Sequence, residues 1–184
     1  MSARIPRLEF EELTPALQDV FRARVERLGY LGEFFKVMGH APETLGGFYT
    51  ITESIKTVLP DNLIEVVSLS LSSRLGNLYE QYQNERLSLK LGLSEDWVAE
   101  ALEPRSGDDS IFSPEEKAVQ AFAIKVVESM GRDVEKELDD LINAIGPQQT
   151  VGVMWLIGRT VTHAMISNTL NLAPPVTSIF DKDD

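Results

Sequence analysis

Two carboxylates and an amide interrupt helices that are otherwise strongly apolar. The stretch 77–94 has the pattern of one helix closed by Gly92, and the face that should be buried carries Glu80 and, four residues later, Asn84. Glu65 lies on the preceding, nearly all-apolar helix. Burying such groups costs free energy unless they are hydrogen-bonded, so the pattern indicates either a structural network or a site.

The two carboxylates are candidates for an acid–base pair. A short turn at Gly76 joins their helices, so Glu65 and Glu80 could approach each other. Two carboxyl groups in one apolar pocket have pKa values that move apart, which leaves one group protonated and the other ionised. That combination suits proton donation and acceptance on an organic acid or ketone. The alternative is that Glu65 bonds backbone groups or a buried arginine, and that Glu80 is half exposed.

Polar side chains also form a line along one face of the last long helix. Trp155, Arg159, His163 and Ser167 are spaced four residues apart among apolar neighbours. An arginine in this setting either pairs with a buried acid, for which Glu65 is a candidate, or receives an anionic ligand. The imidazole of His163 could serve as an acid or base near neutral pH, or could be a hydrogen-bonded core residue.

Two tyrosines flank Glu80. The hydroxyl of Tyr79 or Tyr82 could orient a substrate or hold an oxyanion, although a buried tyrosine with one satisfied hydroxyl is the commoner case. His40, at a helix end, is most simply a capping or surface residue.

The helix signals predict an all-α fold of about eight or nine helices. Capping residues and prolines mark the starts, glycines mark the ends, and no stretch has the alternation of a hairpin. We expect helices over residues 15–28, 31–38, 42–57, 60–75, 77–91, 95–102, 114–130, 134–145 and 148–172. We further expect one domain, 1–184, with helical lobes at about 1–102 and 113–175 joined by a polar loop, 103–112.

Composition excludes several classes of function. The chain has 184 residues and a net charge of −12, which argues against binding to nucleic acid or to an anionic membrane surface. It has no cysteine and two histidines, so thiol catalysis is excluded and a metal site built by the protein is not expected. No apolar run has membrane-spanning length. We expect a cytoplasmic protein that needs neither a metal nor a cofactor.

The spacing of the central segment resembles the carboxymuconolactone decarboxylase family, in the superfamily that also holds the alkyl hydroperoxidase D-type peroxidases. Gly92-Leu93-Ser94 matches the family's Gly-Leu-Ser, and counting back eight residues places Asn84 at the position of the motif histidine. Glu80 and Asn77 then occupy the two cysteine positions, and Glu65 is the upstream acid. The flanking matches are Ile5-Pro6-Arg7, 34–38, 41–43, 113–117 and 166–170, so the resemblance covers nearly the whole chain.

The resemblance implies an all-α subunit that assembles into trimers or hexamers, with its site near a subunit interface. It also implies a cofactor-free enzyme that performs proton transfer on a small oxygenated organic acid or lactone. We expect catalytic roles for Glu80, Glu65 and His163, and substrate contacts from Tyr79, Tyr82, Asn84 and Arg159. The thiol chemistry of the peroxidases cannot operate without cysteine. The alternative is a family member without catalysis that binds a ligand or serves in assembly.

Overall fold

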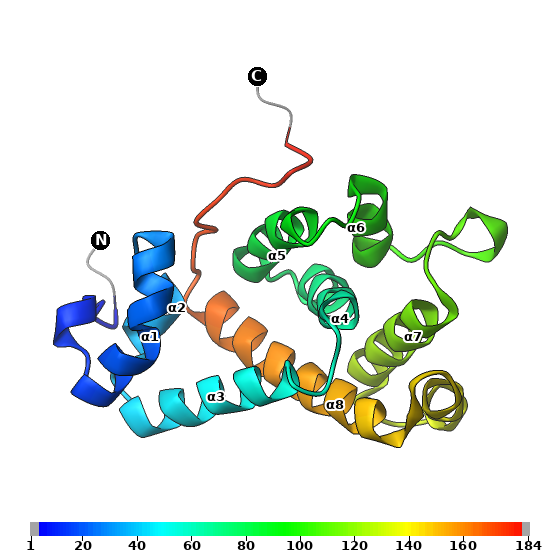
Figure 1. Ribbon diagram of the computed structural model, residues 1–184, viewed down its shortest axis with the longest axis horizontal. Helices are drawn as coiled ribbons and strands as arrows, with labels where there is room; N and C mark the ends of the chain where they lie inside the picture. Colours follow the sequence, from blue (N-terminus) through cyan, green and yellow to red (C-terminus); the bar gives the residue numbers. More distant parts are fainter. Residues whose placement is uncertain (1–3, 182–184) are drawn as a thin grey trace. The chain divides into compact units, whose positions relative to one another are not determined.

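The computed structural model describes residues 4–181, apart from the side chain of Asp108, and the expectation of an all-α fold is confirmed (Figure 1). The α-helices are α1 (Pro15–Leu28), α2 (Glu33–Met38), α3 (Pro42–Ile55), α4 (Asp61–Arg74), α5 (Leu78–Lys90), α6 (Glu95–Leu102), α7 (Pro114–Ser129) and α8 (Glu135–Thr169). Short 3-10 helices cover Phe10–Glu12 and Gly107–Asp109. No strand occurs in the described part of the chain.

Helix α8 corresponds to the last two helices that the sequence predicts, and its axis breaks where they were expected to meet. Gly146 has φ 74 and ψ 168, a conformation that a side chain would strain. Pro147 follows, and proline is accepted at the start of a helical segment because the first amide groups have no helical partner. Along the described residues, no helix, the 35-residue α8 included, has the length and apolar character needed to cross a membrane.

Contacts divide the chain into two compact units, residues 1–51 and 52–184, and the loop 103–112 lies within the second. The first unit is held together by aromatic rings. The ring of Phe21 lies 4.8 Å from that of Phe35 and 5.1 Å from that of Tyr49. Every candidate site residue named above belongs to the second unit.

Helix α4 is the centre of the second unit, and α5, α6, α7 and α8 pack against it (Figure 1). Its side chains Val66, Val67, Leu69 and Leu71 are completely buried. Because residues 65–72 of this helix are buried on every side, the polar residues among them must find partners inside. Ser70, for example, donates a hydrogen bond of 2.8 Å to the carbonyl of Ala101. Glu65 is buried on the same helix, and this makes its environment unusual for a carboxyl group.

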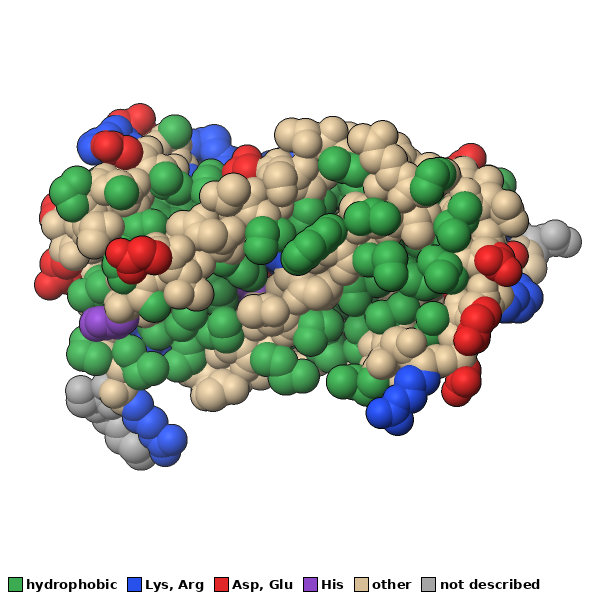
Figure 2. Space-filling model, turned by 90° about the horizontal axis from the view of Figure 1, so that it is seen from below, with side chains coloured by type: hydrophobic (Ala, Val, Ile, Leu, Met, Phe, Trp, Pro, Cys, Tyr) green, Lys and Arg blue, Asp and Glu red, His purple; other side chains and the backbone are tan. Residues whose placement is uncertain are grey.

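Helix α8 has one buried and one exposed face. The buried face includes His163 and points to α4. The exposed face carries Val151, Met154, Trp155 and Met165, with relative exposures of 49–59%. Figure 2 looks at the side of the molecule on which α8 lies, and hydrophobic side chains are gathered over much of it.

Candidate functional site

Glu80 is the centre of a buried polar cluster between α5 and α8. Its Oε1 pairs with Nη1 of Arg159, and its Oε2 lies 3.0 Å from Nδ1 of His163. The amide Nδ2 of Asn77 donates to the same Oε2 over 3.2 Å. The side chains of Glu80 and His163 are 8% and 6% exposed. The buried carboxylate of Glu80 thus has three partners: a guanidinium cation, an imidazole and an amide.

Local helix geometry explains why these side chains meet. Asn77 is the residue that precedes α5, and Glu80 is in the first turn of that helix. Arg159 and His163 are four residues apart on α8, so they share one face of it. Since α4 packs against both α5 and α8, these faces turn inward to the same core. The two segments, far apart in the sequence, are brought together by that packing.

The partners of Glu80 keep it ionised. Burial would raise the pKa of this carboxyl group, but the charge of Arg159, the charge of His163 when its ring is protonated, and the hydrogen bonds from both outweigh burial and lower the pKa to about 2. At neutral pH Glu80 is therefore a carboxylate, and with so low a pKa it is a weak base.

Glu65 has the opposite protonation. Its pKa is raised from 4.5 to about 8, chiefly because burial disfavours the charged form. The hydroxyl of Ser88, which donates to Oε2 of Glu65 over 3.3 Å, lowers the pKa, and the negative charge of Glu80 raises it. Near neutral pH Glu65 therefore carries a proton while Glu80 is ionised.

The carboxylate of Glu80 also sets the orientation of the His163 ring. Nδ1 of His163 has two neighbours, Oε2 of Glu80 at 3.0 Å and the amide Nδ2 of Asn77 at 3.2 Å. An ionised carboxylate only accepts hydrogen bonds, so the closer and charged Glu80 assigns the proton of the neutral ring to Nδ1 and leaves Nε2 as the acceptor nitrogen. Ser167 Oγ lies 3.4 Å from the same Nδ1, and the ring of Tyr79 is 5.9 Å from the imidazole. This is the carboxylate–imidazole arrangement that supports a general base.

Asn77 completes the cluster and leaves one atom unmatched. Its side chain is buried, and its Oδ1 has no hydrogen-bond partner among the described residues. A buried amide oxygen without a partner loses its hydration without compensation. Asn77 therefore presents an acceptor within the cluster.

The structure brings together most of the residues expected from the sequence. Glu80, His163 and Arg159 are in direct contact, Tyr79 packs near the imidazole, and the electrostatic influence of Glu80 reaches Glu65. The expectation that Glu65 could be the partner of Arg159 is wrong, because Arg159 pairs with Glu80.

Asn84 and Tyr82 do not join the cluster. Both are half-buried, and neither side chain forms a hydrogen bond within the described part of the chain. Asn84 does lie one turn after Glu80 on α5, as the four-residue spacing predicts, but its side chain is only half-buried, whereas Glu85 and Ser88 are fully buried.

Three partners in the site were missed as site residues by the sequence analysis. Asn77 enters the sequence pattern only as a position in the resemblance, and the sequence does not single out Ser88 or Thr52. Thr52 Oγ1 accepts from Nε of Arg159 over 3.4 Å. Ser88 could have been found from its place on the buried side of α5, where a serine needs a hydrogen-bond partner. Nothing in the sequence links Thr52 to a residue on α8.

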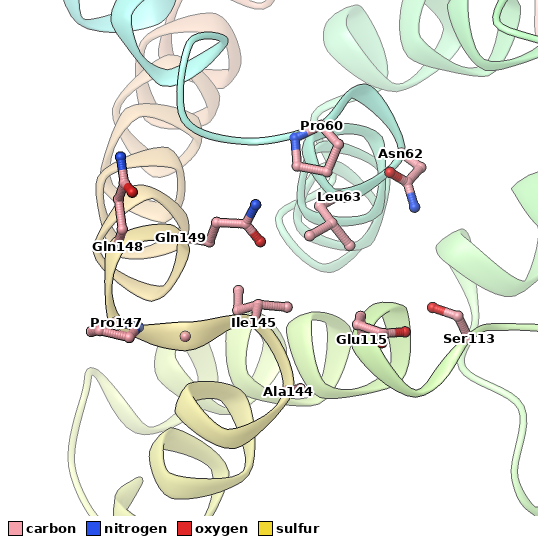
Figure 3. Close-up of a pocket in the computed structure, with 11 residues that line it drawn as sticks. Pro60, Asn62, Leu63, Ser113, Glu115, Ala144, Ile145, Pro147, Gln148 and Gln149 are labelled. Atoms are coloured by element: carbon pink, nitrogen blue, oxygen red, sulfur yellow. The ribbon is translucent and has the colours of Figure 1, made fainter.

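A separate cavity of about 690 Å³ lies at the break in α8 (Figure 3). It is lined by the start of α4 (Pro60, Asn62 and Leu63), the start of α7 (Ser113 and Glu115) and residues 144–149. None of these residues belongs to the Glu80 cluster. In Figure 3 the side chain of Gln149 points into the space between α4 and α8.

No family model matches the chain, and no curated protein matches it. Solved structures do. The debrominase Bmp8 superposes with a TM-score of 0.79 at 19% identity, over 95% of this chain and 93% of that one. An alkylhydroperoxidase AhpD core protein from Ralstonia eutropha, described as peroxidase-related, has a TM-score of 0.73 at 14% identity, over 93% and 91% of the two chains. The chain has the AhpD-like fold.

An uncharacterized peroxidase-related protein from Silicibacter is also similar in structure. Its TM-score is 0.78 at 13% identity, over 95% of this chain and 93% of that one. Bmp8 has also been solved as a Cys-to-Ala variant with bound 2,3,4-tribromopyrrole. None of these proteins is described as a carboxymuconolactone decarboxylase. The structural matches thus show the AhpD-like fold. They do not distinguish the decarboxylase branch from the other branches of the superfamily.

Proposed function

We propose that the protein is a cofactor-free enzyme that performs proton transfer on a small oxygenated organic acid or lactone, as a lyase of the decarboxylase type. One observation carries the proposal. The carboxylate of the buried Glu80 contacts Nδ1 of His163 and pairs with Arg159, and a second carboxyl group, that of Glu65, is buried on α4. A pKa raised to about 8 for Glu65 and lowered to about 2 for Glu80 gives the two groups opposite protonation near neutral pH. A buried proton donor together with a carboxylate–imidazole pair is the set of groups that such a reaction needs.

The proposed roles follow from the protonation states. Glu65 is the proton donor, because it holds its proton at neutral pH and can deliver it to a carbanion or enolate. His163 is the proton acceptor through Nε2, and Glu80 is its positioning partner. In a decarboxylation, the C–C bond to the carboxylate breaks, carbon dioxide leaves, and the electron pair remains as an enolate that Glu65 protonates at carbon.

Substrate contacts are proposed for the residues around this pair. We assign the role of orienting the substrate to Tyr79, Tyr82 and Asn84. Tyr82 and Asn84 lie outside the hydrogen-bonded cluster, so their contacts with the substrate would be peripheral. Arg159 would attract the substrate's carboxylate, which would have to compete with Glu80 for the guanidinium. Asn77 Oδ1 adds an acceptor for an N–H or O–H group of the substrate.

The exposed apolar face of α8 supports a further part of the proposal, that the protein forms a homo-oligomer. Contiguous apolar surface on a helix is typical of a face that another chain covers. Arg159 is on the same helix, between Trp155 and His163, so an oligomer built on this face would close over the neighbourhood of the site.

The alternative is a protein of the same fold that binds a ligand or serves in assembly without catalysis. The saturated pairing of Glu80 with Arg159 favours it, because a fully satisfied ion pair has no need of a substrate. Thiol-based peroxidase or dehalogenase chemistry is excluded for this chain, because it has no cysteine.

The test is a screen for proton transfer with small 2- and 3-oxo acids and unsaturated lactones, followed by NMR in deuterated buffer. The proposal expects loss of carbon dioxide, or exchange of a carbon-bound proton, with at least one of them. Glu65→Gln and His163→Gln should each lower the rate about a hundredfold or more. The exposed Glu95→Gln on α6 is the matched control and should keep full activity. A wild-type protein that binds such acids and never exchanges a proton would support the alternative.

A further inference from the structure

Four basic side chains line one hollow on the second unit, away from the Glu80 cluster. Arg74 ends α4, Arg105 follows α6, and Lys117 and Lys125 lie on α7. The hollow has a volume of about 440 Å³, which is within the range of small-molecule sites. None of its lining residues belongs to the proposed catalytic cluster.

The sign of this charge is opposite to that of the whole chain. The protein has 17 basic and 29 acidic residues, yet four of those basic residues share one hollow. Glu128 is the one acid among the residues that line it. Such a local reversal in a strongly acidic protein creates a place where an anion is attracted while the rest of the surface repels it.

The basic groups are only loosely paired with the protein's own acids. Arg74 lies 4.0 Å from Glu103 and 3.9 Å from Glu128, and Arg105 lies 3.7 Å from Asp96. These separations exceed hydrogen-bonding distance. By contrast, the nitrogen–oxygen distance is 2.6 Å in the surface pair Lys136–Asp140 and 2.9 Å in the pair Arg7–Glu33.

The two lysines are also without a neutralising acid. Neither Lys117 nor Lys125 forms an ion pair with any acidic side chain that the structure describes. The four cations of the hollow therefore keep most of their capacity to bind an anion.

Helix stability does not account for this arrangement. A cation at the end of α4 is favourable, because it faces the negative pole of that helix, and this explains Arg74 alone. Lys117 is the fourth residue of α7, near the positive pole of that helix, so the dipole gives it no stabilisation. The helix dipoles therefore do not explain why Lys117 shares a hollow with three other cations.

The wall between the charges is apolar. Ala121 and Ile124 lie between Lys117 and Lys125 on one face of α7, and Pro104 lies beside Arg105. Guanidinium groups bind carboxylate and phosphate oxygens in a planar, two-point geometry. We propose that this hollow binds a small organic polyanion, whose carboxylate or phosphate groups contact the arginines and lysines and whose apolar body lies on α7.

The experiment is calorimetric titration of the full-length protein with phthalate, phenyl phosphate and inorganic phosphate, at low and at high salt. Phthalate and phenyl phosphate should bind more tightly than inorganic phosphate, because only they can use the apolar wall. Comparison of the first two probes decides whether the natural group is a carboxylate or a phosphate. Affinity should fall as salt is raised.

Variants locate the binding. Arg105→Gln and Lys125→Gln should each weaken binding about tenfold, since each removes a charged hydrogen-bond donor. Lys90→Gln removes one exposed positive charge on α5 and should change the affinity less than twofold. Backbone amide shifts on titration should centre on residues 104–128. The proposal is overturned if no probe binds at millimolar concentration, or if Arg105→Gln, folded by circular dichroism, binds like Lys90→Gln.

Discussion

The imidazole Nδ1 of His163 lies 3.0 Å from the carboxylate Oε2 of Glu80, and Arg159 holds the other oxygen of the same carboxylate. One ionised group thus orients a base and neutralises a cation at the same time. This relationship ties α5 to α8 and decides what each member of the cluster can do chemically.

The first prediction concerns the tautomer of His163. Because Glu80 accepts from Nδ1, the neutral ring should carry its proton on Nδ1 and have a basic Nε2. Nitrogen-15 NMR of labelled histidine distinguishes the two ring nitrogens directly. The signals of His40 are identified with His40→Gln. In Glu80→Gln the preference for Nδ1–H should weaken, and an Nε2–H ring in the wild type would contradict the assignment.

The second prediction concerns the ion pair of Glu80 and Arg159. Glu80→Met leaves a largely buried guanidinium without its partner and should lower the free energy of unfolding by about 3 kcal/mol. Adding Arg159→Met should recover much of that loss, because two well-packed apolar side chains replace two charges. Chemical denaturation of both single variants and the double variant gives the coupling energy. Strictly additive effects would mean that the pair contributes nothing.

The third prediction is a fall in stability with rising pH that comes from Glu65. Its pKa is about 8 in the folded protein and 4.5 as a free group, so the folded state keeps a proton that the unfolded state loses. The stabilisation is fully present below about pH 4.5 and is lost as pH rises toward 8, on the order of 3–5 kcal/mol in all.

The matching variant is Glu65→Gln, which is neutral at every pH and can still accept from Ser88. It should flatten the decline between pH 5 and 8, as measured by urea denaturation at a series of pH values. Glu80 acts in the opposite sense: its pKa of about 2 provides stability above pH 4.5 that is lost as pH falls toward 2. A Glu65→Gln variant whose stability declines as steeply as that of the wild type would remove Glu65 as the cause.

The fourth prediction concerns the segment after α8, which docks on α5 through Glu85. This fully buried carboxylate accepts hydrogen bonds from Ser178 Oγ over 2.7 Å and from the backbone amide of Ile179 over 3.0 Å. Glu85→Ala should release residues 176–181 and cost about 1–3 kcal/mol of stability. Hydrogen exchange of those amides should accelerate, while the exposed Glu95→Ala leaves it unchanged. Equal protection in both variants would show that other contacts hold the segment.

The fifth prediction concerns the exposed face of α8. If a second copy covers this face, Trp155→Glu should shift the protein toward the monomer in light scattering coupled to gel filtration. Met130→Glu is the matched control, because Met130 is 82% exposed and follows α7. A wild-type protein that is monomeric at micromolar concentration would refute the homo-oligomer.

Local signals in the sequence predicted most of the helices. Ser113 and Glu116 form the capping box that their spacing indicates, and Gly146 breaks α8 where two helices were expected to meet. The pairing of Arg159 could not be predicted in the same way. Both Glu65 and Glu80 were available acids, and only the packing of the helices in three dimensions selected Glu80.

By itself, the sequence determined the all-helical fold and the presence of polar groups that had to be buried. Helix periodicity and capping are local properties, so they are readable from neighbouring residues. The tertiary structure decided which of those groups meet, that Glu65 keeps a proton while Glu80 loses one, and that Asn84 stays outside the cluster. The physical reason is that pKa values and partners depend on burial and on charges from distant segments, and these exist only once the helices have packed.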